Sequence, residues 1–302
     1  MGQAVTQGDE TVLVTGGGQL AGALGRQAWP AGLTPLYLPR DRLDITDREA
    51  VAAVLRAHPI SAIINTAAWT DVDGAEAAER QAYAVNAEAP ALLADAAERA
   101  GACLIHVSTD YVFGHGQGPW DEESRTAPLN VYGASKLAGE KAVLRPDTPH
   151  RVVRTSWVFD SCGRNFVTTM LGLADRPQLQ IIDDQWGTPT AAADLAASLI
   201  ELARTWRRPT SQRLLHFANS GQATRYDMAE AVFERLGRSG VTTPLLERVS
   251  SASRPCPAVR PSDSRLDIGR WTALAGQAPR HWRAALDQVV DDWAARRGEG
   301  SQ

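Results

Sequence analysis

Short apolar runs alternate with longer segments rich in alanine and leucine along the first half of the chain. The runs cover residues 11–15, 36–38, 61–65, 103–107 and 151–155. Apolar runs of this length, bounded by turn residues, are typical of strands buried on both faces of a sheet. The intervening segments predict helices at 19–29, 47–58 and 87–100, and a further helix that starts near Tyr132. This alternation predicts an α/β fold, a Rossmann-type parallel sheet with helices on both faces.

The pattern loosens after residue 155, where helices are predicted at 195–204, 226–236 and 282–293 and a strand at 214–217. We therefore expect a dinucleotide-binding Rossmann domain at 1–155 and a mainly substrate-binding domain at 156–302. The second domain is expected to be smaller, mixed in structure and discontinuous, with part of it returning to the sheet. Its segment 250–264, rich in Pro, Ser and Arg, is either a flexible linker or an ordered loop whose arginines bind a phosphate-bearing ligand.

The composition is that of a globular protein, with 44% hydrophobic and 22% charged residues in a chain of 302. A net charge of −4 argues against nucleic acid as a partner. The three cysteines, Cys103, Cys162 and Cys256, show neither a disulfide framework nor a metal-binding spacing, so no metal site is expected. No apolar stretch is long enough to cross a bilayer, and the polar segment 1–10 lacks the apolar core of a signal peptide. We therefore expect a cytoplasmic protein with no membrane partner.

A glycine-rich turn separates the first predicted strand from the first predicted helix. Gly16, Gly18 and Ala21 fit the spacing Gly-x-Gly-x-x-Gly/Ala, and Gln19 and Leu20 lie at the start of the helix. Backbone N–H groups at such a turn can bind the pyrophosphate of a dinucleotide. The alternative is a plain strand–helix turn, in which glycine serves only to allow positive φ. The strand before the turn and the helix after it favour the cofactor site.

Residues after the second and third strands bear on the choice of cofactor. Arg40 can meet the 2′-phosphate of NADPH, although it can equally be a solvated arginine, and NADH stays possible. Asp44 and Ile45 can place a carboxylate and an apolar side chain around the adenine, although Asp44 can also be explained as an acid near a helix N-terminus. After the third strand, small residues would let the cofactor approach the backbone in the segment Ala67, Ala68 and Trp69.

Tyr132 and Lys136 lie four residues apart, which on a helix places them on the same face. A cation beside a phenol favours phenolate, so we expect Lys136 to lower the pKa of Tyr132 toward neutral pH. Such an acid can protonate a ketone oxygen as a hydride reaches the carbon. Thr109, after the fourth strand, can donate a hydrogen bond to the same ketone, or it can cap the backbone instead.

These motifs together make the chain similar to the extended short-chain dehydrogenase/reductase superfamily, and within it to the dTDP-4-dehydrorhamnose reductase family. The resemblance covers nearly the whole chain. The matching segments are residues 43–47, 108–114, 128–133, 136–140, 154–158, 165–166, 184–190, 218–221 and 260–261. Arg-Thr-Ser-Trp from Arg154 and Asp-Gln-Trp-Gly-Thr-Pro-Thr from Asp184 discriminate best, because Tyr-x-x-x-Lys belongs to the entire superfamily.

The resemblance implies an NAD(P)H-dependent reduction of the C4 ketone of dTDP-4-dehydro-6-deoxy-L-mannose to dTDP-L-rhamnose. It implies that Tyr132 protonates the C4 oxygen, that Lys136 binds the nicotinamide ribose, and that Thr109 polarises the ketone. The residues implied to contact the dTDP-sugar substrate are Thr109, Asp110, Trp157, Asn165, Gln185 and Arg260.

The chain departs from the family pattern at two places. The glycine turn is one residue shorter if Gly18 takes the middle place; in the ungapped register Gln19 takes it. Ala23 stands where some relatives carry a glutamate that holds Mg²⁺ at a dimer contact, so a monomer or homodimer without Mg²⁺ is expected. Two alternative functions remain: a reductase of another nucleotide-linked keto sugar, of the dihydrostreptose type, and a non-catalytic regulatory subunit that binds the cofactor.

Overall fold

The structure is a computed structural model that describes residues 10–299. Its centre is a six-stranded parallel sheet in the order β10-β5-β4-β3-β1-β2. The strands are β1 (Glu10–Thr15), β2 (Leu33–Leu38), β3 (Ile60–Asn65), β4 (Cys103–Thr109), β5 (Arg151–Thr155) and β10 (Leu214–His216). The predicted Rossmann-type sheet is confirmed. The polar segment 1–9 lies outside the described residues.

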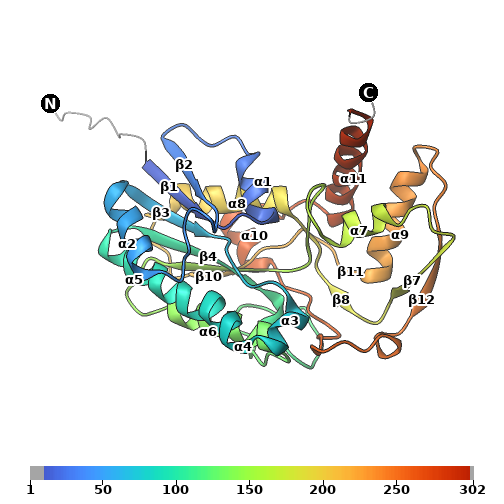
Figure 1. The fold of residues 1–302 in the computed structure, drawn as a ribbon, viewed down its shortest axis with the longest axis horizontal. Coiled ribbons are helices and arrows are strands. Elements are labelled where there is room, and N and C mark those ends of the chain that lie inside the picture. The colour runs from blue at the N-terminus through green and yellow to red at the C-terminus, as the bar shows by residue number, and fades with distance from the viewer. Residues whose placement is uncertain (1–9, 300–302) are drawn as a thin grey trace.

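Helices cover both faces of this sheet (Figure 1). On one face lie α1 (Gln19–Gly25), α8 (Ala192–Thr205) and α10 (Gly269–Ala275), and their apolar side chains share a core with Val12, Val14 and Ile64. On the other face lie α2 (Arg48–Ala57), α5 (Ala89–Arg99) and α6 (Val131–Val143), which pack on Leu13, Ile63 and Leu104. Alternate residues of each strand therefore point into the two cores, which explains why the strands read as continuous apolar runs.

A second lobe lies beyond the carboxyl ends of the strands (Figure 1). Its helices are α7 (Phe166–Gly172), α9 (Arg225–Gly237) and α11 (Trp282–Glu299), and its own core includes Phe159, Met228 and Leu286. Three short strand pairs complete it: β6 (Val158–Phe159) with β9 (Thr190–Ala191), β7 (Gln178–Ile182) with β12 (Leu245–Val249), and β8 (Trp186–Gly187) with β11 (Ala223–Thr224). The predicted mixed C-terminal region is present, and β10, α8 and α10 return from it to the sheet. The division at residue 155 stays a prediction.

Two helices differ from the sequence prediction. Helix α1 ends at Gly25 rather than residue 29, because the Trp29 indole turns back to donate a hydrogen bond to Leu24 O at 3.2 Å. The helix expected at 87–100 instead begins upstream, because α4 (Glu79–Tyr83) continues through a π-helical turn, η1 (Ala84–Glu88), into α5. The short helix α3 (Val72–Ala77) precedes α4 and is separated from it by the non-helical Ala78. The π-helical turn aims the buried Asn86 side chain at the backbone of Trp69, whose N–H it accepts at 2.8 Å and whose carbonyl it donates to at 3.1 Å.

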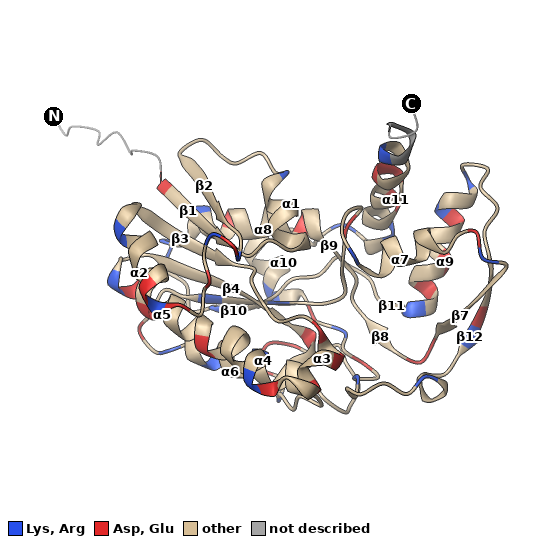
Figure 2. Ribbon diagram, in the orientation of Figure 1, with Lys and Arg blue, Asp and Glu red and all other residues tan. Residues whose placement is uncertain are grey.

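Charges of both signs are interspersed along the outer helices, among them α2, α5, α6 and α9 (Figure 2). The described helices include none that is long and apolar enough to span a bilayer.

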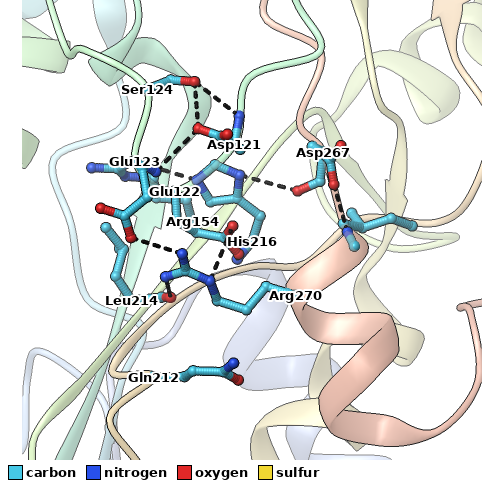
Figure 3. Close-up of polar contacts among 12 residues, drawn as sticks. Asp121, Glu122, Glu123, Ser124, Arg154, Gln212, Leu214, His216, Asp267 and Arg270 are labelled. Atoms are coloured by element: carbon cyan, nitrogen blue, oxygen red, sulfur yellow. Dashed lines mark hydrogen bonds and ion pairs between the residues drawn. The ribbon is translucent and has the colours of Figure 1, made fainter.

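A buried polar cluster holds β10 against the loop before α6 (Figure 3). The Glu122 carboxylate accepts the backbone N–H of His216 at 2.9 Å. In the His216 ring, Nδ1 lies 3.1 Å from Trp120 O and 3.2 Å from Asp267 O. Because both carbonyls can only accept, His216 carries its proton on Nδ1 and leaves Nε2 to accept from Arg154 Nη1, 3.3 Å away. Burial and the neighbouring Arg154 cation lower the pKa of His216 to about 3.

We expect the free energy of unfolding to fall as the pH is lowered from 7 to 5. Burial lowers the pKa of both His106 and His216 in the folded chain, while the unfolded histidines titrate near 6.5. Below that value the unfolded chain binds more protons, and each histidine removes about 1.4 kcal/mol of stability per pH unit. Two buried carboxyls with raised pKa values, Asp110 and Glu122, oppose this loss as they take up protons. Urea unfolding at half-unit pH intervals measures the slope; a flat profile between pH 7 and 5 would contradict the buried neutral histidines.

Candidate active site

A cleft of about 1130 Å³ opens at the carboxyl ends of the strands, where parallel α/β sheets bind their ligands. Each of the first five strands contributes the residues that follow it. The sequence-predicted residues that line the cleft are Gly16, Gly18, Gln19, Leu20, Arg40, Asp44, Ile45, Ala67, Ala68, Thr109, Asp110, Tyr132, Lys136, Trp157 and Asn165. The fold therefore brings most of the predicted cofactor and substrate residues to one place.

The glycine turn closes on the loop after β3. Gly16 has φ of 93°, and a Cβ there would lie 2.9 Å from Ala67 N, so any larger residue would be both strained and in contact with backbone. Gly18 is the N-cap of α1 and provides no side chain to satisfy the first N–H groups of the helix. Gly17, which the sequence interpretation left out, also lines the cleft. The exposed backbone N–H groups and the room around them fit the pyrophosphate of a dinucleotide.

The adenosine end of the cleft differs in part from expectation. Arg40 and the buried Ile45 line it, while the Asp44 carboxylate is already bonded to Thr46, through the backbone N–H at 2.9 Å and the hydroxyl at 2.7 Å. These bonds lower the pKa of Asp44, so the carboxylate stays ionised. Trp69 does not line the cleft, because its indole N–H turns away to donate to Asp71 O at 2.9 Å.

Tyr132 and Lys136 lie on the face of α6 that meets β4. Asn130 caps the helix by accepting the Gly133 N–H at 2.8 Å, which sets the first turn under Tyr132. The Lys136 amine is 2.7 Å from Val107 O and 3.2 Å from His106 Nε2, and burial lowers its pKa to about 8.

The expectation that Lys136 lowers the pKa of Tyr132 is wrong for this structure. Burial raises the pKa of Tyr132, and a hydrogen bond with Thr109 offsets only part of that rise. The Lys136 amine is directed toward β4, and in the low dielectric of the interior the phenol is favoured over the phenolate. Tyr132 therefore keeps its proton at neutral pH.

Thr109 and Asp110 form the floor of the cleft beside Tyr132. Thr109 Oγ1 lies 3.1 Å from Asp110 Oδ1, and Ser156 Oγ donates to Asp110 Oδ2 at 3.0 Å. Asp110 is 2% exposed, and burial raises its pKa. Thr109 also accepts the Tyr111 N–H at 3.2 Å, so the capping role that the sequence left open is present together with the contact to Tyr132.

Trp157 is held in a backbone conformation that is rare for an aromatic residue, with φ of 47°. Its ring packs directly on Gly187, where a Cβ would lie 2.3 Å from the indole. Gly187 belongs to the segment Asp184–Thr190 that carries the family resemblance, and this contact is the physical reason for glycine there. Strain of this kind is stored at binding sites.

Arg225, at the start of α9, is a further cleft residue that sequence reasoning missed. Its guanidinium stacks 3.6 Å from the centre of the Trp157 ring and 5.3 Å from that of Phe166. Burial lowers its pKa, opposed by the nearby Tyr111 and Asp110. No carboxylate forms an ion pair with it among the described residues. Nothing in its sequence context distinguishes it from the other arginines of the chain.

Asn165 lines the cleft but uses its side chain to cap α7, accepting the Thr168 N–H at 3.1 Å and donating to Asp160 O at 2.9 Å. Gln185 and Arg260 line an adjoining cavity of about 560 Å³, which shares Tyr111, Phe166 and Arg225 with the cleft. The loop 250–264 that lines this cavity is ordered rather than a linker.

Arg260 connects that loop to the sheet domain. Its guanidinium makes two bonds to Asp73, Nη1 to Oδ1 at 3.0 Å and Nη2 to Oδ2 at 2.7 Å, and Asp73 Oδ1 also accepts the Ala258 N–H at 3.1 Å. The predicted ligand residue is thus engaged in holding the loop over the cavity.

Among the side chains that the structure describes, residues 10–296, no group of three or more His, Cys, Asp or Glu could hold a metal ion. Ala23 is 1% exposed and belongs to the face of α1 that packs into the core, so position 23 offers no oxygen ligand.

Comparison with known proteins agrees with this geometry. Residues 10–295 match the family described as the RmlD substrate binding domain. The dTDP-4-dehydrorhamnose reductase of Mycobacterium tuberculosis H37Rv is 46% identical over 92% of this chain and 91% of its own, and that of Escherichia coli K12 is 40% identical over 82% and 85%. A crystal structure of dTDP-4-dehydrorhamnose reductase from Bacillus anthracis in complex with NADP superposes with a TM-score of 0.85 at 32% identity, covering 94% of this chain and 99% of that one.

Proposed function

The chain belongs to the dTDP-4-dehydrorhamnose reductase family, and from this premise we propose how its own residues carry the reaction. It is an oxidoreductase that reduces the C4 ketone of dTDP-4-dehydro-L-rhamnose to dTDP-L-rhamnose. Reduced NADP, when bound along the glycine turn and α6, supplies the hydride. The observation that carries the site assignment is the convergence of Tyr132, Thr109 and Lys136 in one cleft at the strand ends.

Tyr132 is the proton donor in this proposal. Its pKa is raised by burial, so the phenol holds its proton until negative charge develops on the ketone oxygen. Thr109 polarises the same oxygen, and Asp110 and Trp157 line the sugar side of the cleft. Lys136 lies one turn further along α6, where it would meet the nicotinamide ribose. Arg40 would meet the 2′-phosphate.

Arg225 is the proposed partner of the substrate diphosphate. It lines both the cleft and the adjoining cavity, so it stands where a ligand joining a sugar to a nucleoside would pass from one to the other. The Arg225 guanidinium is partly buried and has no ion-pair partner within the described part of the chain, so it gains from a diphosphate, whose oxygens accept charge-assisted bonds. The nucleoside would then occupy the cavity of Gln185 under the loop held by Arg260.

Replacing Arg225 with methionine should raise KM for the dTDP-sugar by about 10- to 100-fold, because hydrogen bonds to charged groups contribute about 1.5–3 kcal/mol. We expect Kd for NADPH to change much less. The matched control is Arg235→Met, on the exposed side of the same helix, where the arginine pairs with Asp291. Steady-state kinetics for the two variants checks the prediction, and equal KM values in both would contradict a diphosphate contact at Arg225.

The function is tested by a coupled assay in which dTDP-4-dehydro-6-deoxyglucose and its 3,5-epimerase are supplied with NADPH or NADH. We expect oxidation of the cofactor only when the sugar is present, and faster with NADPH. UDP- and GDP-linked keto sugars, with the dihydrostreptose precursor, test the alternative substrates. Cofactor binding without turnover on any sugar would favour the regulatory subunit.

We also propose a cytoplasmic enzyme that acts as a monomer or as a homodimer without a shared Mg²⁺ ion. The buried Ala23 supports the absence of that metal bridge. Sedimentation at micromolar concentration, with and without Mg²⁺, separates the two assemblies.

A further inference from the structure

His106 contacts the Lys136 amine and is not among the residues that line the cleft. It is 1% exposed, on β4, between the side chain of Asn65 and the amine of Lys136. Asn65 Nδ2 is 3.0 Å from His106 Nδ1, and Lys136 Nζ is 3.2 Å from His106 Nε2. Both ring nitrogens therefore have one polar neighbour each, and the direction of each bond depends on where the histidine carries its proton.

The amide of Asn65 can face only one way. Its Oδ1 atom accepts the Ala67 N–H at 3.1 Å, and the Thr15 hydroxyl at 2.7 Å. A backbone N–H is always a donor, so the atom opposite it must be the amide oxygen. The amide nitrogen is consequently the atom that faces His106, and it donates.

This orientation determines the tautomer of His106. Because Nδ1 accepts from Asn65, it carries no proton, and the neutral ring has its proton on Nε2. Burial is the main cause that lowers the pKa of His106 well below 6.5, and Lys136 lowers it further whenever it is protonated, so the ring is neutral in either state of the lysine. The Nε2–H therefore points at the lysine amine. His216 has the opposite tautomer, since two carbonyls face its Nδ1.

We propose that His106 is a positioning residue of the reaction, whose Nε2–H donates to the uncharged Lys136 amine and opposes protonation of that amine. An ammonium has three donors and no acceptor, so it meets the Nε2–H donor to donor, whereas a neutral amine accepts from it. Val107 O, at 2.7 Å, accepts from Lys136 in either state and does not distinguish them. The amine is thereby held near the point at which it can gain and lose a proton at working pH.

The proposal deepens the proposed function and rests on it. When hydride reaches C4, the O–H bond of Tyr132 breaks and its proton forms the new O–H bond of the sugar. The resulting phenolate regains a proton from the Lys136 ammonium through solvent in the cleft that both side chains line, and solvent returns a proton to the amine. An ammonium with an ordinary pKa would hold its proton too tightly for this exchange at neutral pH.

The charged group that opposes this effect is Glu140, one turn further along α6, whose carboxylate raises the pKa of Lys136. Glu140 is itself engaged by the Arg154 guanidinium at 2.7 and 2.9 Å and by the Ser108 hydroxyl at 2.6 Å. Its charge is therefore largely neutralised, and burial prevails in lowering the pKa of Lys136.

The tautomer is tested first, on the unmodified protein. Two-bond ¹H–¹⁵N spectra of ¹⁵N-histidine protein at pH 7 should show His106 with a protonated Nε2 and an unprotonated Nδ1. The opposite tautomer, or a doubly protonated ring, would overturn the proposal. This measurement needs neither turnover nor a variant, so its outcome does not depend on whether the proposed function is correct.

The consequence for the reaction is tested with His106→Gln. The glutamine amide can rotate to present its oxygen to Lys136, which converts an opposing donor into an acceptor that favours the ammonium. We expect the alkaline limb of the kcat profile, near pH 8 in the unmodified enzyme, to move up by about one unit or more. An unchanged limb in an active variant would overturn the proposal.

The matched control is His150→Gln, which also replaces a fully buried histidine. His150 bonds to Leu104 N at 3.1 Å and to Ala94 O at 3.1 Å, away from Lys136. Its loss should lower stability without moving the alkaline limb, and a shift equal to that of His106→Gln would show that the effect is general to core substitutions and would overturn the proposal.

Discussion

Replacing Tyr132 with phenylalanine should lower kcat by about 10² to 10⁴, the usual contribution of a positioned general acid. The substitution removes one oxygen and leaves the ring, which packs edge to face on Tyr111 with centroids 5.7 Å apart. Binding of NADPH, followed by fluorescence, should be nearly unchanged. Tyr226→Phe, on α9 outside the cleft, is the control and should retain full turnover. A Tyr132→Phe enzyme that keeps most of its activity would refute the assignment of the acid.

The raised pKa of Tyr132 also bears on how activity depends on pH. Because burial raises the pKa of Tyr132, its phenol stays protonated well above neutrality and produces no loss of activity near pH 8. A limb in that range belongs to Lys136, whose pKa is about 8. The acid and its neighbour thus have pKa values moved in opposite directions by one cause, desolvation, since burial disfavours phenolate and ammonium alike.

Replacing Arg154 with methionine should destabilise the protein by about 3–5 kcal/mol, because the Glu140 carboxylate would remain buried without its partner. The side chains of this pair are 4% and 2% exposed. Arg154 also donates to His216 Nε2, so its loss opens the cluster that Figure 3 shows around His216. For a chain of 302 residues we expect the midpoint of thermal unfolding to fall by about 5–10 °C.

Two further variants distinguish the effect of an unpaired buried charge on stability from the effect of removing any arginine. The double variant Arg154→Met, Glu140→Leu should recover part of the loss, because no unpaired charge then remains in the core. Arg204→Met breaks the exposed ion pair with Glu201 on the surface of α8 and should leave stability nearly unchanged, because solvent screens such a pair. Equal losses for Arg154→Met and Arg204→Met, measured by urea unfolding, would contradict the prediction.

Much of the sheet could be predicted because its strands are buried on both faces and so consist of uninterrupted apolar residues. The predicted strand at 151–155 coincides with β5, and Asp47, where the predicted helix 47–58 begins, caps α2 by accepting the N–H groups of Glu49 and Ala50. Helix ends were less certain, since they depend on contacts between elements. The early end of α1 is set by Trp29, and the π-helical turn by the bonds of Asn86 to Trp69.

The sequence by itself determined which residues can meet at the strand ends. Tyr132, Lys136, Thr109 and the glycine turn each follow a strand or begin a helix, and parallel strands bring those positions to one edge. These spacings along the chain can be read from the sequence without knowledge of the fold.

Only the tertiary structure decided the environment of those groups. Desolvation reversed the expected shift of the Tyr132 pKa, and Arg225 entered the site from a helix more than 90 positions later in the chain than Tyr132. The proton on His106 is directed by Asn65, which is itself oriented by Ala67 and Thr15 from neighbouring segments. Burial and hydrogen-bond direction depend on which side chains surround a group in space, and the order of residues along a strand or helix does not contain that information.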